Sequence, residues 1–205
     1  MNTLGQPTAH DVLDFWLGDG LARGWCSDPR DELWFGGDPA FDDKIRARFG
    51  PLVEQAVDGG LTEWETRIDT RLALVLLLDQ FTRNVYRGQA RAFAGDARAQ
   101  QLSLQARAGG MDAELATVGC VFMALPLEHA EDLGLQVESV LRFQRLFDTC
   151  VPELRDTLGG FLRYAQQHHD IVARFGRFPH RNKVLGRAST PAEEAFLQDG
   201  PRFGQ

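Results

Sequence analysis

The chain has 205 residues, of which 43% are hydrophobic and 25% charged, a balance that excludes extensive disorder. Its formal net charge of −7 argues against non-specific binding of nucleic acid, which needs a basic surface. The length suffices for one sizeable domain, so we expect a single domain over residues 1–205, while a second is not required.

The spacing of the cysteines and the length of the apolar runs indicate the cellular compartment of the protein. Cys26, Cys120 and Cys150 lie far apart and form no CxxC motif, which is typical of reduced thiols in a cytoplasmic protein. Residues Met1–Asp11 contain no basic region followed by an apolar one, so we expect no signal peptide. The longest apolar run, Leu72–Leu78, is too short to span a bilayer, so we expect no membrane partner.

Capping signals predict two helices near the N-terminus. The pattern Thr8-x-x-Asp11 is a capping box that starts the first helix, and Gly18 ends it. Asp38-Pro39 places an N-cap before a proline at the first position of the second helix, and Gly50-Pro51 predicts a kink or a restart within it. The loop between them carries Trp25, Trp34 and Phe35. These aromatic side chains either line a groove or cover the open end of a helical bundle.

The central helix is predicted over residues 67–86. Its Leu72–Leu78 segment has no polar face, which indicates packing on all sides. Two polar stripes then continue the helix; they contain Asp79, Gln80, Arg83, Asn84 and Arg87. Asp79 and Arg83 have the spacing of an i,i+4 ion pair.

Helical signals continue through the middle of the chain. We expect Asp96 to cap a helix that stops at Gly109-Gly110. We expect Pro126 to end the next apolar segment and Glu128 to open another helix. The apolar side of that helix carries Leu135, Val140, Leu141 and Phe147, with the polar Gln136 among them.

The last two predicted helices complete an all-α fold. Pro152 starts a long helix that ends at Gly176 and delivers His168, His169 and Asp170 near its end. The capping box Thr190-Pro191-Ala192-Glu193 opens a short final helix. No segment alternates with period two, so we expect only helices, joined by short loops and packed as antiparallel neighbours.

Three blocks of this sequence resemble the bacterial domain-of-unknown-function family 924. They are Leu77-Leu78-Asp79-Gln80-Phe81-x-Arg83-Asn84-x-Tyr86-Arg87, Pro126-x-Glu128-His129-x-Glu131 and Arg174-Phe175-Gly176-Arg177-Phe178-Pro179-His180-Arg181-Asn182-x-x-Leu185-Gly186-Arg187. The resemblance extends from Val12 to Leu197. It implies a single helical domain similar to a tetratricopeptide-type right-handed superhelix, and it implies no activity and no catalytic residue.

Polar residues gather in three groups, each at or near the end of an apolar helix: residues 79–87, 128–131 and 168–187. We expect the three groups to converge, either as a buried network that locks helix ends together or as a ligand pocket. Charged groups are rarely buried unless they are paired, and both signs are present here.

Our main functional hypothesis is a pocket for a small anionic ligand. Arginine, histidine and asparagine side chains supply many hydrogen-bond donors for phosphate or carboxylate. The candidate ligand-binding residues are Arg83, Asn84, Arg87, His129, Arg177, His180, Arg181, Asn182 and Arg187.

Two alternatives belong to other classes. A metal-dependent phosphohydrolase would use the His169-Asp170 dyad together with His129 as metal ligands; otherwise we expect no metal or cofactor. A tetratricopeptide-like interaction module would bind a peptide in a concave groove, by analogy of fold alone. Whether the protein is an enzyme, and its oligomeric state, stay open at this point.

Overall fold

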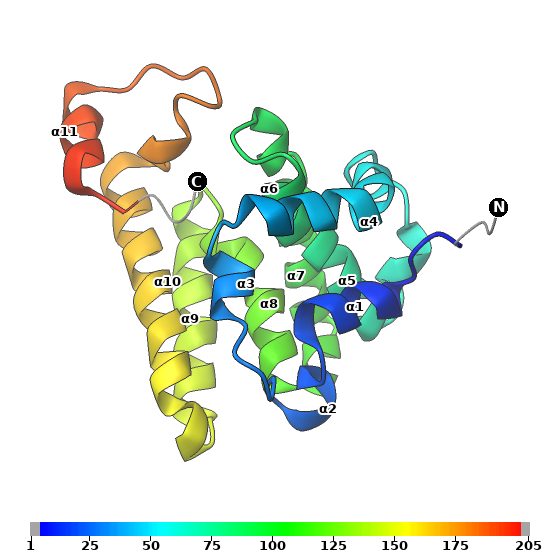
Figure 1. Cartoon of the computed structure of the whole chain (residues 1–205). Coiled ribbons are helices and arrows are strands. Elements are labelled where there is room, and N and C mark those ends of the chain that lie inside the picture. Colours follow the sequence, from blue (N-terminus) through cyan, green and yellow to red (C-terminus); the bar gives the residue numbers. More distant parts are fainter. Residues whose placement is uncertain (1–4, 202–205) are drawn as a thin grey trace.

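The computed structural model describes residues 5–201 (Figure 1). The ends of the predicted domain, including the first four residues of the Met1–Asp11 segment, lie outside the described residues. Every regular element within residues 5–201 is a helix, which confirms the all-α prediction. No helix in this range is both long and apolar enough to cross a membrane.

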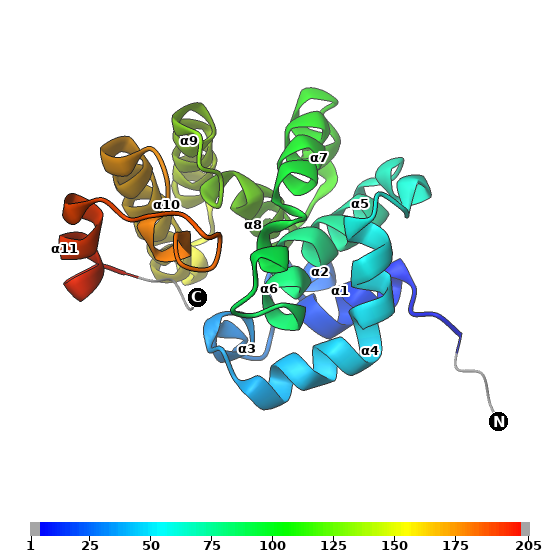
Figure 2. The ribbon, with the colours of Figure 1, turned by 90° about the horizontal axis from the view of Figure 1, so that it is seen from above.

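The N-terminal elements follow their capping signals. They are α1 (Ala9–Leu17), α2 (Gly20–Arg23), α3 (Asp31–Phe35), α4 (Pro39–Val57) and the 3₁₀ turn η1 (Thr62–Glu65). The capping box at Thr8, the end at Gly18 and the Asp38 cap are all present. Helix α4 runs through Pro51 without a restart. Figure 2 shows that it changes direction in its second half, which agrees with the kink predicted from Gly50-Pro51.

The central segment is continuous but not uniformly α-helical. It consists of α5 (Ile68–Val75), a π-helical stretch η2 (Leu76–Phe81) and α6 (Thr82–Val85). Every side chain from Leu72 to Leu78 is fully buried, which confirms the prediction of packing on all sides. Because the apolar run is buried, the polar side chains that follow it on the same helix are drawn into the interior too.

The C-terminal part contains α10, the longest helix within residues 5–201. The elements are η3 (Ala90–Phe93), α7 (Asp96–Ala108), η4 (Met111–Glu114), α8 (Thr117–Glu128), α9 (Leu133–Thr149), η5 (Pro152–Leu154), α10 (Arg155–Phe175), η6 (Pro179–Arg181) and α11 (Pro191–Asp199). Helices α8, α9 and α10 pack side by side (Figure 1). The Gly109, Gly176 and Thr190 boundaries are where the sequence predicted them.

Three predictions in this part were wrong. Asp96 does not cap α7, because its carboxylate is turned toward two arginines and Gly95 occupies the cap position. Pro126 does not end α8, which continues to Glu128, because a proline in the last turn removes only one N–H of the helix. The next helix therefore begins at Leu133, after an Asp132 cap. On that helix Leu141 is 58% exposed and does not join the apolar side.

The apolar interior consists of one large cluster and a small C-terminal one. The large cluster centres on α5 and η2 and includes Trp16, Phe49 and Phe122. The small one joins Ile171, Val172 and Phe178, with Phe196 of α11 packed against it. Figure 2 shows α10, α9, α8 and α7 following one another across the molecule, with α3 and α4 on the opposite side.

Candidate functional site

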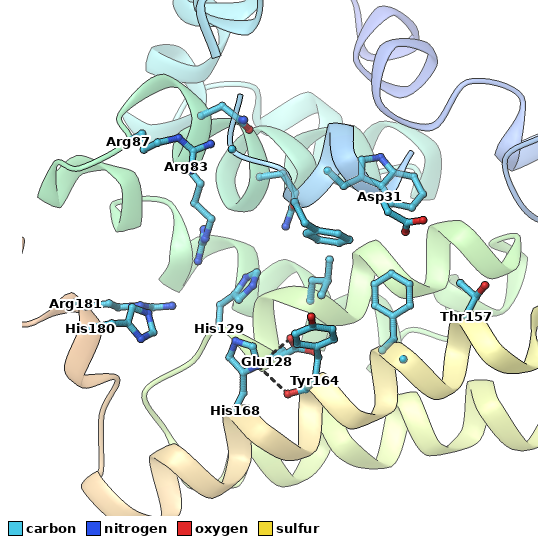
Figure 3. Close-up of a pocket in the computed structure, with 18 of the residues that line it drawn as sticks. Asp31, Arg83, Arg87, Glu128, His129, Thr157, Tyr164, His168, His180 and Arg181 are labelled. Atoms are coloured by element: carbon cyan, nitrogen blue, oxygen red, sulfur yellow. Dashed lines mark hydrogen bonds and ion pairs between the residues drawn. The ribbon is translucent and has the colours of Figure 1, made fainter. Parts of the chain in front are cut away.

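A cavity of about 530 Å³ opens where α3, α6, α8, α10 and η6 approach one another (Figure 3). Each of the three predicted polar groups contributes to its wall, so the predicted convergence is confirmed. The residues that line it are Asp31, Trp34, Phe35, Gly37, Gln80, Arg83, Asn84, Arg87, Leu125, Glu128, His129, Asp156, Thr157, Gly160, Phe161, Tyr164, His168, His180 and Arg181.

Two buried arginines meet at one end of the cavity and share Asp96. Arg83 donates from Nη1 to Asp96 Oδ1 at 3.0 Å and from Nη2 to Oδ2 at 3.2 Å, which is a bidentate pair. The predicted ion pair of Arg83 with Asp79 also forms, at 3.4 Å, so Asp96 is the nearer partner. Arg181 donates to the same Asp96 Oδ2 at 3.4 Å.

Arg181 is the less completely paired of the two. Its guanidinium lies between the rings of Phe93 and Phe178, 4.5 Å from each ring centroid. Its buried Nε meets no acceptor within residues 5–201. Burial, together with the charge of neighbouring Arg83, lowers the pKa of Arg181 to about 10, although Asp96 raises it. A charged donor in these surroundings is stabilised by an incoming anion.

His129 is oriented by a fully buried carboxylate. Its Nδ1 lies 2.7 Å from Oδ1 of Asp79, which also accepts a hydrogen bond from Gln80 Nε2 at 2.6 Å. Burial lowers the pKa of His129, and Arg83 lowers it too, although Asp79 raises it. The imidazole is therefore neutral near pH 7, with Nδ1–H donated to Asp79 and Nε2 left on the side of the cavity. No hydrogen bond engages Nε2 within residues 5–201.

Glu128 and His168 form a second buried pair on the floor of the cavity. His168 Nδ1 lies 2.8 Å from the Tyr164 carbonyl oxygen and 3.1 Å from Glu128 Oε1 (Figure 3). Burial raises the pKa of Glu128 well above its usual range, and the Asp79 charge adds to this, whereas burial lowers the pKa of His168. Burial thus favours the neutral form of both groups. Glu128 Oε2 is buried without a partner in the described part of the chain.

Gln136 binds the main chain at the C-terminal end of α8. Its side chain is fully buried in α9 and its Nε2 donates to the main-chain oxygens of Glu128 and Ala130, at 2.6 and 2.7 Å. Carbonyl groups at a helix C-terminus lack partners within the helix, and Gln136 supplies one. The glutamine that interrupts the predicted apolar face of α9 thus fixes the backbone that carries Glu128 and His129.

Three predicted ligand-binding residues lie outside the cavity. Arg177 pairs with Glu193 at 2.7 and 2.9 Å. Arg187 pairs with Glu131 and donates from Nε to Asn182 Oδ1 at 3.0 Å. Glu131 also accepts the main-chain N–H of Phe178 at 2.8 Å. These contacts attach the segment after α10 to the rest of the molecule and thereby position His180 and Arg181.

Two further predicted residues line the cavity but already have an acidic partner. Arg87 makes a bidentate pair with Asp42, at 2.6 and 3.0 Å, and Asn84 donates to Asp42 at 2.8 Å. Of the alternative metal ligands, His129 lies in the cavity, whereas His169 and Asp170 contact each other on the surface of α10. No group of three or more His, Cys, Asp or Glu side chains is arranged to hold a metal ion within residues 5–201.

The far end of the cavity is lined by aromatic side chains, and the sequence indicated only those that come from α3. Trp34 and Phe35 of α3 pack edge to face on each other, and Phe35 does the same with Phe161 of α10. Exposed Asp31 and Asp156 stand at the same end. The sequence predicts that these loop aromatics either line a groove or cover the end of the bundle, but their spacing does not indicate that α10 supplies the opposite wall.

Fold and site together define an all-helical protein with a cavity that is basic at one end and aromatic at the other. The chain belongs to the family of bacterial proteins of unknown function DUF924, whose family model matches residues 12–201. A solved structure, a protein of unknown function (ATU0120) from Agrobacterium tumefaciens, is 38% identical with a TM-score of 0.73. The match covers 94% of this chain and 97% of that one. No curated protein matches the chain.

Proposed function

We propose that this protein binds a small amphipathic ligand with one anionic group and an apolar or aromatic body. The observation that carries the proposal is Arg181, a buried guanidinium with one hydrogen bond of 3.4 Å and an Nε that meets no acceptor within residues 5–201. A buried charge so weakly paired is costly for the folded state unless a ligand completes it. Phosphate and carboxylate match the planar fork of arginine.

The two ends of the cavity suggest the ligand's shape. The anionic group would lie against Arg181, Arg83 and His129, and the body would extend toward the rings of Phe35 and Phe161. The exposed carboxylates of Asp31 and Asp156 disfavour a second anionic group at the far end. The volume, about 530 Å³, lies within the usual range for small-molecule sites.

The alternatives receive less support. A purely structural network would pair its buried groups fully, and Arg181 Nε and Glu128 Oε2 have no partner in the described residues. The proposed metal set is divided between the cavity and the exposed face of α10. A peptide groove needs accessible side chains along several helices, whereas here the distinctive polar residues gather around one cavity.

Finer points of fold and location belong to the same proposal. We infer that the chain is a single cytoplasmic domain whose helices pack as antiparallel pairs in a tetratricopeptide-like right-handed superhelix. The succession of contacts from α7 to α8, α9 and α10 supports this arrangement. Three free thiols support the inferred cytoplasmic location.

Thermal unfolding with phenylphosphonate, an aromatic ring carrying one phosphonate group, tests the proposal. A ligand that binds only the folded state raises its stability by about 2.7 kcal/mol at one hundred times Kd. For a chain of this size that corresponds to a rise in Tm of roughly 2–4 °C per kcal/mol. We expect the rise for the wild type and its loss in Arg181→Met.

The matched control is Arg177→Met, which removes an arginine outside the cavity. Its own Tm falls because Glu193 loses its partner, but we expect the shift caused by phenylphosphonate to equal that of the wild type. Inorganic phosphate and benzyl alcohol, which carry the head or the body alone, should each give a smaller shift. Absence of any shift in the wild type would contradict the proposal.

A further inference from the structure

The buried polar groups of the cavity wall include a histidine whose orientation is fixed by a carboxylate. His129 lines the cavity and its Nε2 makes no hydrogen bond within residues 5–201, while its Nδ1 lies 2.7 Å from Asp79 Oδ1. An Nδ1–H donated to a carboxylate fixes the tautomer and increases the basicity and nucleophilicity of Nε2. Asp79 is itself fully buried and is held by Gln80, so the orientation of the ring is set before any ligand arrives.

A proton donor and two cations surround the same ring. Glu128 lines the cavity beside His129, and its Oε2 has no partner within residues 5–201. Burial favours the protonated form of this carboxyl group, since it raises its pKa well above the usual range. Arg83 lies close enough for its charge to lower the pKa of His129, and Arg181 lies beside Arg83.

We propose that the protein is a metal-independent phosphomonoesterase in which His129 is the nucleophile and Glu128 the general acid, with aryl or similarly apolar phosphate monoesters as substrates. This inference rests on the proposed anion site. Two guanidinium groups match the equatorial oxygens of a phosphoryl group undergoing transfer better than they match the single oxyanion of an acyl transfer. Among residues 5–201, no serine or cysteine lines the cavity to serve as a competing nucleophile.

The reaction balances without a cofactor. In the first step His129 Nε2 forms a bond to phosphorus as the bond from phosphorus to the ester oxygen breaks. Glu128 gives its proton to that oxygen, and the alcohol or phenol leaves. In the second step water attacks the phosphohistidine, the nitrogen–phosphorus bond breaks, and Glu128 recovers a proton from the water. The products are one alcohol and one inorganic phosphate per ester and water consumed.

Hydrolysis of para-nitrophenyl phosphate by the whole protein, in the presence of a metal chelator, tests the inference. We expect release of para-nitrophenol by the wild type and a loss of at least about a hundredfold in kcat for His129→Gln, whose amide preserves a donor toward Asp79. Glu128→Gln should lower kcat strongly for this ester. His169→Gln, which changes a partly buried histidine of α10 outside the cavity, is the matched control and should retain wild-type turnover.

A covalent readout separates the nucleophile from a structural or general-base role. After rapid quenching at alkaline pH, the wild-type peptide containing His129 should carry the mass of one phosphoryl group, in an acid-labile bond. Turnover that needs His129 but never gives this adduct would overturn the nucleophilic assignment, and wild-type turnover in His129→Gln would overturn the inference altogether.

Binding and turnover fail separately. If phenylphosphonate stabilises the protein but para-nitrophenyl phosphate is not hydrolysed, the inference is overturned and the binding proposal stands. If phenylphosphonate has no effect and no hydrolysis occurs, both are overturned. Circular dichroism of each variant, compared with the wild type, shows whether lost turnover comes with an intact fold.

Discussion

Asp96 lies between two buried guanidinium groups that it pairs unequally. Arg83 has both terminal nitrogens on this carboxylate and a further contact to Asp79, whereas Arg181 reaches one oxygen at 3.4 Å. Removing one partner of a well-paired buried ion pair strands a charge and costs about 3–5 kcal/mol. Removing a weakly paired charge relieves its desolvation cost. The two arginines therefore have opposite expected effects on stability.

We expect Arg181→Met to leave the free energy of unfolding unchanged or to raise it by up to about 2 kcal/mol, because Met keeps apolar volume between Phe93 and Phe178. We expect Arg83→Met to lower it by about 3–5 kcal/mol, since Asp96 and Asp79 then lose their main cation. Urea unfolding at pH 7 measures both. A loss of 3 kcal/mol or more in Arg181→Met would make that residue structural.

Residue types in the sequence indicated which side chains would gather at this end of the cavity. Arg83, His129 and Arg181 were predicted ligand-binding residues and all line the cavity. Arg177 and Arg187 were predicted with them and instead hold the segment after α10 in place. That segment has no helical period to indicate where each side chain points, so composition could suggest a basic cluster without separating its ligand-facing members from its structural ones.

At the scale of elements, the π-helical stretch η2 depends on a very close approach by the start of α7. A Cβ built on Gly95 would lie 2.3 Å from the main-chain oxygen of Leu78, where no side chain fits. The contact sets the position of Asp96, the next residue, against Arg83. π-Bulges are often found at functional sites, and here the bulge carries Asp79 and Gln80.

We expect Gly95→Ala to lower the free energy of unfolding by at least about 1–3 kcal/mol, because backbone rather than a flexible side chain must move. Gly160→Ala in α10 is the matched control: beyond its chain neighbours and its own helix backbone, the nearest atom would be 3.9 Å away at the end of the Arg163 side chain, so the change should stabilise the helix by up to about 1 kcal/mol. Thermal unfolding of both variants measures this. Equal stability of Gly95→Ala and the wild type would contradict the close approach.

Elements that depend on local contacts were predictable, and those that depend on distant partners were not. The caps at Thr8, Asp38 and Thr190 use hydrogen bonds within a few residues, so the sequence contains the whole signal. Asp96 also looked like a cap, but arginines from α6 and η6 compete for its carboxylate. The apolar run does not indicate the π-helical register of η2, because a segment buried on all sides shows no periodicity of polar and apolar residues.

At the scale of the whole molecule, buried histidines link stability to pH. Burial lowers the pKa of His129, of His168 and, to about 3, of His180, so these rings stay neutral in the folded state. In the unfolded chain they titrate near 6.5. Below that pH the unfolded state therefore binds more protons than the folded state, and the free energy of unfolding falls as the pH falls.

Glu128 acts in the opposite direction. Because its pKa is raised in the folded state, Glu128 keeps a proton there that the unfolded chain releases above about pH 4.5. Its contribution to the free energy of unfolding therefore falls as the pH rises. Three histidines act against one carboxyl group between pH 5 and 7. We therefore expect a net fall in the free energy of unfolding when the pH falls from 7 to 5.

Urea unfolding at pH 5, 6 and 7 and constant ionic strength measures this loss. His180→Gln removes one buried ring that resists protonation, so its dependence on pH should be weaker than that of the wild type by up to about 1.4 kcal/mol per pH unit. His10→Gln changes an exposed ring and should keep the wild-type dependence. If the free energy of unfolding stayed constant or rose toward pH 5, the three histidines would have to become protonated in the folded state. The cavity wall would then stabilise their positive charge.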